Sequence, residues 1–157
     1  MKVGVFAGTF DPITKGHEQV IEKSVGLFDK LVVALCINED KHTLYSVEKR
    51  LEMLNAVCKK YDNVEVCYHQ GLLVDLLKEK NSVYSVRGVR NNTDYLYENN
   101  MHFVNKKLYS KIITIYLPCD EEFLNISSTA VRESIKKGED LSYYLSSEVI
   151  DIIKREN

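Results

Sequence analysis

The chain has 157 residues, of which 45% are hydrophobic and 28% charged, and its formal net charge at pH 7 is −2. This composition predicts one soluble globular domain, residues 1–157, with a sizeable core. The slightly negative charge argues weakly against nonspecific binding to nucleic acid. No apolar run approaches the roughly 18 residues that a membrane span needs. We therefore expect a cytoplasmic protein that binds neither nucleic acid nor a membrane.

The first half of the chain alternates apolar runs with amphipathic stretches. Val3 to Ala7 is a short apolar run, typical of a buried parallel strand. Apolar side chains then recur at helical spacing, which predicts a helix from Gly16 to Phe28. The next predicted elements are a strand at Leu31–Ile37, a polar loop to Ser46, a helix from Ser46 and a strand at Val64–Cys67.

The second half continues the alternation and decides the fold class. Its predicted elements are a helix from Gly71, a strand at Val83–Val86, helices at Thr93–Leu108, Ser127–Lys136 and Ser147–Lys154, and a strand at Ile112–Leu117. Strands that alternate with helices predict an α/β fold, here a Rossmann-like, doubly wound parallel sheet of five strands with helices on both faces. Ligands of such sheets bind beyond the carboxyl ends of the strands.

The segment from Gly8 to His17 is the strongest functional signal. A strand that ends in Gly8-Thr9 and a helix that starts at Gly16-His17 leave backbone N–H groups pointing into a crevice, which suits phosphate. A lone histidine at a helix start is more often structural, but these neighbours favour His17 as a donor to a phosphate oxygen. No carboxylate at helical spacing orients it as a base, although Asp11 remains an alternative.

Two arginines flank Gly88 where the fourth predicted strand ends. The forked guanidinium groups of Arg87 and Arg90 match phosphate oxygens in pairs. The alternative is that both are surface charges paired with Asp94 or Glu98. These two acids lie about one helical turn apart, so they could face the same crevice.

A run of small hydroxyl residues precedes the helix predicted to end near Lys136. Ser127, Ser128 and Thr129 suit a helix cap, and a purely structural cap is one interpretation. Beside two other loops suited to phosphate, the run is also a candidate second anion site.

Several motifs are missing from the chain. It has no GxxxxGK[ST] P-loop, no GxGxxG after the first strand, no GxSxG elbow and no HExxH. Its four cysteines (Cys36, Cys58, Cys67 and Cys119) form no CxxC pair, which favours buried or incidental thiols. The chemistry should therefore depend on positioning and charge stabilisation of a phosphoryl or nucleotidyl group, without a covalent nucleophile.

Three segments together resemble the nucleotidylyltransferase superfamily. They are GTFDPITKGH (8–17), RGVRNNTDYLYE (87–98) and ISST (126–129). The superfamily carries a (T/H)xGH signature and an ISSTxxR-like segment. Over nearly its whole length the chain is most similar to the bacterial phosphopantetheine adenylyltransferases, and Thr14 in the first place of the signature agrees with them.

The resemblance implies a reaction, a cofactor and an assembly. ATP and 4′-phosphopantetheine would give dephospho-coenzyme A and pyrophosphate, the penultimate step of coenzyme A synthesis. The acceptor phosphate would attack the α-phosphorus of ATP in line, with no covalent enzyme intermediate. Mg²⁺ would accompany the triphosphate, held mainly by its phosphates rather than by protein ligands. The family also implies a homohexamer and feedback inhibition by coenzyme A.

The resemblance also assigns roles to residues. The catalytic residues would be His17, Lys41 and Arg90, with His17 stabilising the transition state and Lys41 holding the attacking phosphate. ATP would contact Thr9, Phe10, His17, Gly88, Val89, Arg90, Glu98, Phe123, Leu124, Asn125, Ile126, Ser127, Ser128 and Thr129. Phosphopantetheine would contact Thr9, Lys41, Leu73, Arg87 and Asn105.

The chain departs from the family pattern in three places. Ala7 stands where proline is usual, and Lys15 where asparagine is common, but neither change removes a needed group. The loop from Cys119 to Asn125 is acidic and one residue longer than usual.

Two alternatives stay open. One is another enzyme of the superfamily, which adenylates nicotinamide mononucleotide or cytidylylates a phosphorylated alcohol. Thr14 argues against it, because those relatives usually carry histidine there. The other is a regulatory module that binds nucleotide without catalysis.

Overall fold

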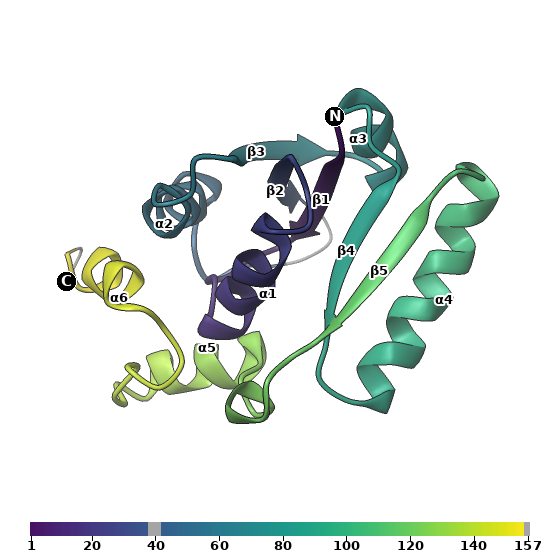
Figure 1. Ribbon diagram of the computed structural model, residues 1–157. Helices are drawn as coiled ribbons and strands as arrows, with labels where there is room; N and C mark the ends of the chain where they lie inside the picture. The colour runs from purple at the N-terminus through teal and green to yellow at the C-terminus, as the bar shows by residue number, and fades with distance from the viewer. Residues whose placement is uncertain (38–41, 156–157) are drawn as a thin grey trace.

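Five parallel strands form one sheet in the order β3-β2-β1-β4-β5 (Figure 1). The computed structural model describes residues 1–37 and 42–155. The strands are β1 (Val3–Gly8), β2 (Lys30–Ile37), β3 (Val64–Gln70), β4 (Tyr84–Val89) and β5 (Ile113–Pro118). Since every neighbouring pair is parallel and helices connect the strands, the predicted Rossmann-like fold class is confirmed.

The helices occupy the predicted segments, with shifted ends. They are α1 (Lys15–Val25), α2 (Val47–Cys58), α3 (Leu73–Glu79), α4 (Asn92–Leu108), the 3₁₀ turn η1 (Glu121–Phe123), α5 (Ser128–Lys136) and α6 (Ser147–Lys154). Among these helices, none combines the length and the apolar character that crossing a bilayer would demand, as judged over residues 1–37 and 42–155.

Four predicted boundaries were wrong by two residues or more. The first helix stops at Val25, because Phe28 packs under β1 so closely that a Cβ on Gly4 would lie 2.5 Å from its ring. Strand β3 continues to Gln70, and Gly71 adopts φ +123° before α3 starts at Leu73. Strand β4 continues to Val89, so its pairing with β5 includes residues that the sequence had placed in a loop.

Side chains of the central strands alternate between two apolar layers. On one face, Phe6, Leu31 and Leu35 pack in a cluster with buried residues of α1, α2, α5 and α6. On the other face, Val5 and Ala34 pack in a second cluster with buried leucines of α3. The larger cluster fixes α1 and α5 near the middle of the sheet, and both carry functional candidates.

Strands β1 and β4 pair only over a short length. The register joins Gly4 to Tyr84 and Val5 to Ser85 and continues no further. The chain also reverses its direction of winding here, since β2 and β3 lie on one side of β1 while β4 and β5 lie on the other. Such a switch point opens a crevice at the carboxyl ends of the strands.

Candidate active site

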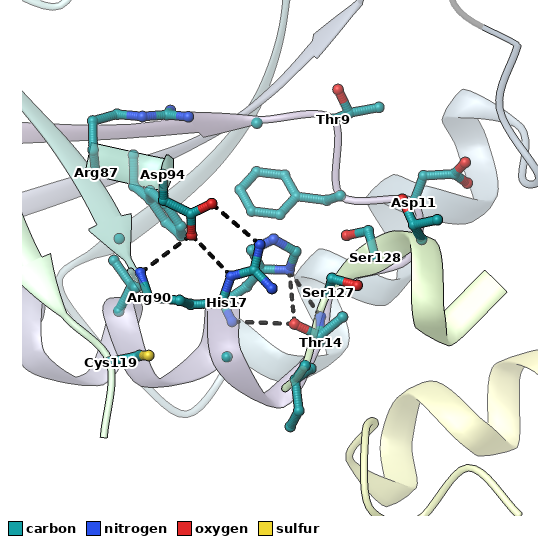
Figure 2. A pocket seen from close by; sticks show the side chains of 18 of the residues that line it. Thr9, Asp11, Thr14, His17, Arg87, Arg90, Asp94, Cys119, Ser127 and Ser128 are labelled. Atoms are coloured by element: carbon teal, nitrogen blue, oxygen red, sulfur yellow. Dashed lines mark hydrogen bonds and ion pairs between the residues drawn. The ribbon is translucent and has the colours of Figure 1, made fainter. Parts of the chain in front are cut away.

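A cavity of about 440 Å³ lies at this switch point. Its volume is within the range of small-molecule sites, which is about 300–1,000 Å³. Four parts of the chain line it. They are the β1–α1 loop, the end of β4 with the start of α4, the segment leading into α5, and His42 with Thr43 before α2; the first three are seen in Figure 2. The predicted site residues that it brings together are Thr9, Phe10, His17, Arg87, Gly88, Val89, Arg90, Glu98, Phe123, Ile126, Ser127, Ser128 and Thr129.

Other predicted residues lie elsewhere. Leu124 and Asn125 are exposed, in the same loop as Phe123, but do not line the cavity. Leu73 opens α3 and Asn105 lies on α4, both outside the cavity lining. Lys41 falls outside the described residues. The roles assigned to these side chains stay predictions.

His17 is held by the start of its own helix. Thr14 is the N-cap of α1, and the backbone N–H of His17 donates to the Thr14 hydroxyl at 3.3 Å. In return, the backbone N–H of Thr14 donates to Nδ1 of His17 at 3.0 Å. This is a capping box in which histidine replaces the usual glutamate. The orienting partner of His17 is thus a backbone N–H and not a carboxylate.

These bonds decide the protonation of the imidazole. A backbone N–H can only donate, so Nδ1 must accept, and a neutral ring then carries its proton on Nε2. Burial away from water, followed by the positive charges of Arg87 and Arg90, lowers the pKa of His17 from 6.5 to about 4. His17 is therefore neutral at pH 7 and can donate a hydrogen bond from Nε2.

The lowered pKa predicts how stability depends on pH. Between pH 6.5 and about 4, the unfolded chain binds a proton at His17 that the folded protein excludes. The free energy of unfolding should therefore fall as pH drops through this window, and be fully regained above pH 6.5. Urea titrations at pH 7 and pH 5 should show a weaker pH dependence in His17→Gln than in the wild type. Equal dependence in both proteins would rule out the assigned protonation state.

Thr14 should matter for stability as well as for orientation. Its side chain is buried, its hydroxyl caps α1, and the hydroxyl oxygen lies 3.2 Å from Nδ1 of His17. Thr14→Val should lower the free energy of unfolding by about 1 kcal/mol, the usual cost of losing an N-cap. Thr14→Ser keeps the hydroxyl and should remain near the wild type in the same urea titration. If the serine variant loses as much stability as the valine variant, the hydroxyl bond is not the cause.

Arg87 and Arg90 are each paired with a carboxylate of α4. Arg87 donates from Nε and Nη2 to Glu98, at 2.8 and 3.0 Å, and from Nη1 to the carbonyl of Ala7 at 2.6 Å. Arg90 donates from Nε to Asp94 at 3.0 Å. Both predictions for the arginines hold in part. Arg87 and Arg90 pair with the two acids, and all four side chains line the cavity. An incoming phosphate would compete with these carboxylates for the guanidinium forks.

Two buried charges fasten the β1–α1 loop and were not identified from the sequence. The Asp11 carboxylate accepts from the backbone N–H groups of Leu44 and Tyr45, at 2.7 and 2.9 Å. Arg50 donates to the carbonyls of Thr9 and Tyr45, each at 3.0 Å. The two bonds of Asp11 and the bond from Arg50 to Thr9 span more than thirty residues of chain, so no local pattern could have revealed them. They rule out Asp11 as the residue that orients His17.

The N-terminus of α5 forms the opposite wall. Ser127 is its N-cap and accepts from the backbone N–H of Ala130 at 3.1 Å, as the hydroxyl run predicted. Arg132 also lines the cavity and was missed, although it occupies the arginine place of the ISSTxxR-like segment. It donates to Thr129 and to the backbone carbonyl of Asp11, both at 3.2 Å. Helix α5 therefore adds a cation, Arg132, and its positive N-terminal end to the cavity.

The cysteines lack the character of nucleophiles. All four are free thiols, and burial raises the pKa of each, to about 11 for Cys36 and about 12 for Cys58. Cys119 lines the cavity but stays protonated at pH 7 for the same reason. This agrees with chemistry that depends on charge stabilisation.

Comparisons of the sequence with known proteins identify its family. A model described as cytidylyltransferase-like matches residues 5–134. The phosphopantetheine adenylyltransferase of Thermotoga neapolitana is 42% identical over 147 residues, which cover 94% of this chain and 91% of the relative. The chain belongs to the phosphopantetheine adenylyltransferase family. The member from Clostridium botulinum strain Hall is 39% identical over 155 residues, 99% of this chain and 94% of that protein.

Membership of the phosphopantetheine adenylyltransferase family makes the protein a nucleotidyltransferase and sets aside a purely regulatory module. A solved structure of Plasmodium falciparum nicotinic acid mononucleotide adenylyltransferase, complexed with NaAD, superposes with a TM-score of 0.72. It covers 99% of this chain and 96% of its own at 20% identity, so it supports the fold alone.

Proposed function

We propose that the protein transfers the adenylyl group of ATP to 4′-phosphopantetheine, giving dephospho-coenzyme A and pyrophosphate. The observation that carries this proposal is the bond from the Thr14 N–H to Nδ1 of His17, which leaves Nε2 as the donor in a cavity that Arg87, Arg90 and the start of α5 also line. The acceptor comes from the family, since relatives at 42% and 39% identity are phosphopantetheine adenylyltransferases.

The residues of the cavity suit in-line transfer without an enzyme nucleophile. His17 would donate from Nε2 to the oxygen on which charge develops at the α-phosphorus, with Thr9 alongside. Arg90, Ser128 and Thr129 would hold the outer phosphates of ATP, because a cation and a helix N-terminus both favour anions there. Arg87, with Lys41, would hold the acceptor phosphate in line for attack.

We propose that Mg²⁺ arrives with the triphosphate of ATP, where it would offset negative charge on the phosphates. The nearby carboxylates are already engaged, Asp94 by Arg90 and Glu98 by Arg87. Within residues 1–37 and 42–155, no three His, Cys, Asp or Glu side chains come together as a metal site. Phosphate oxygens and water would then be its main ligands.

A pyrophosphate-release assay with ATP, Mg²⁺ and phosphopantetheine tests the proposal. The expected result is release that depends on all three components and produces dephospho-coenzyme A. Parallel reactions with nicotinate mononucleotide, and with CTP and a phosphorylated alcohol, examine the other chemistries of the superfamily. Release with one of these acceptors and none with phosphopantetheine would overturn the proposed acceptor.

The resemblance implies a homohexamer, and we further propose that copies of the chain associate through α4. No side chain of α4 is fully buried, and several large apolar ones are exposed, including Leu96, Tyr97, Phe103, Val104 and Leu108. This helix flanks β5 at the edge of the sheet (Figure 1). An exposed apolar face of this kind marks an interaction surface. Sedimentation at several concentrations should show an assembly larger than the monomer.

We also propose a cytoplasmic location and feedback inhibition by coenzyme A. A cytoplasmic location agrees with four free thiols, which persist in a reducing compartment. Coenzyme A, which shares its phosphopantetheine portion with the substrate, would compete at the acceptor site as a feedback inhibitor.

A further inference from the structure

The acidic loop after β5 is tied to the helix that carries His17. Gln19 is 8% exposed and uses both ends of its amide on one residue. Its Nε2 donates to the Asp120 carboxylate at 2.5 Å, and its Oε1 accepts from the backbone N–H of Asp120 at 2.9 Å. Lys23, one turn further along α1, donates to the Pro118 carbonyl at 2.8 Å and to Asp120 at 3.1 Å.

Asp120 begins the segment that leads to the N-terminus of α5, the opposite wall of the cavity. The carbonyl of Asp120 accepts from the N–H of Phe123 at 2.9 Å, which starts η1, and the carbonyl of Phe123 accepts from Ile126 at 3.1 Å. Phe123 and Ile126 both line the cavity. Further along the loop, the Tyr143 hydroxyl donates to the Glu122 carbonyl at 2.9 Å. The segment is thus fixed at Asp120 by α1 and at Glu122 by the chain between α5 and α6.

We propose that Gln19 and Asp120, supported by Lys23, form a clasp that positions the nucleotide-binding loop relative to His17. Gln19 and Asp120 are positioning residues: neither lines the cavity, and they act through Phe123, Ile126 and the start of α5. The inference rests on the proposed function in its choice of ATP as the ligand of this loop. It gives the unusual loop after β5 a role in nucleotide binding rather than in acceptor binding.

The chemistry of the clasp makes its residue types specific. An amide can both donate to a carboxylate and accept from a backbone N–H, whereas a carboxylate at position 19 can only accept. Gln19→Glu would therefore set two carboxylates against each other and break the bond to the Asp120 side chain. Adding Asp120→Asn would restore a donor and reform the pair with reversed polarity.

Four variants test the clasp by steady-state kinetics. Gln19→Leu and Gln19→Glu should raise KM for ATP about tenfold, the effect of losing a hydrogen bond to a charged group. KM for phosphopantetheine should change less than about twofold, because only one wall of the cavity is displaced. The double variant Gln19→Glu with Asp120→Asn should return close to the wild type. Glu122→Gln is the matched control, since it removes a charge from the same loop and leaves the clasp intact.

Two outcomes would overturn the proposal. One is a KM for ATP in Gln19→Glu no higher than in Glu122→Gln; the other is a double variant as impaired as the single one. Hydrogen exchange at the amides of Phe123 and Ile126 should be faster in Gln19→Leu than in the control. Calorimetric ATP binding should weaken alongside. These two readouts need no turnover, so they decide the clasp even if phosphopantetheine proves not to be the acceptor.

Discussion

Replacing His17 with alanine should lower kcat by more than about 100-fold, the expected loss when one transition-state donor is removed. Nε2 of His17 is a proton donor because the Thr14 N–H occupies Nδ1, and the low pKa keeps the ring neutral. Alanine removes this donor. The pyrophosphate-release assay at saturating ATP and phosphopantetheine measures the effect.

The variant must also be shown to fold. His17→Ala removes one bond of the capping box, so a loss of about 1 kcal/mol is expected in a urea titration, small beside a typical total stability. His69 is a partly exposed histidine near the end of β3, so His69→Ala is the matched control and should retain wild-type turnover. A folded His17→Ala protein with near-normal kcat would refute the assigned role.

Replacing Arg50 with methionine should lower the free energy of unfolding by about 2–4 kcal/mol, the range for breaking a buried charge network. Arg50 is 4% exposed, and its guanidinium joins the carbonyls of Thr9, Tyr45 and Ser46. Methionine fills similar space but leaves these acceptors, and the nearby Asp11 carboxylate, without their cation. Chemical denaturation of the wild type and the variant measures the loss.

The control for Arg50 lies on the same helix. Lys49→Met removes an equal charge from a partly exposed position of α2 and should change stability by less than about 1 kcal/mol. If both variants lose the same amount, net charge rather than the buried network explains the effect. Since Arg50 holds the carbonyl of Thr9, the methionine variant should also raise KM for both substrates.

The fold could be predicted because its signals are local. Apolar runs such as Leu31–Ile37 and the periodic helices are complete within a dozen residues, and their alternation determines the parallel sheet. The boundaries that were wrong depended on distant packing instead. Phe28 leaves its helix to fill the space under Gly4, and Arg87 and Gly88 stay in β4 because β5 pairs with them.

The candidate site shows the same contrast between local sequence motifs and contacts with distant residues. The phosphate-suited loops could be found by motif, and the cavity brings them together. The bonds that hold the β1–α1 loop could not be predicted. Those from Asp11 to Leu44 and Tyr45, and from Arg50 to Thr9, span 33 to 41 residues of chain. The partner of His17 was missed for a different reason: sequence patterns show side chains, whereas the group that orients this ring is a backbone N–H.

The contacts of helix α1 restrict insertions and deletions within it. It begins with the bonds at Thr14, carries His17 in its first turn, and meets the loop after β5 through Gln19 and Lys23. One inserted residue between His17 and Gln19 would rotate the rest of the helix by about 100°. Gln19 and Lys23 would then point away from Asp120. Substitutions on the outer face of α1 should therefore be tolerated, whereas insertions and deletions within it should not.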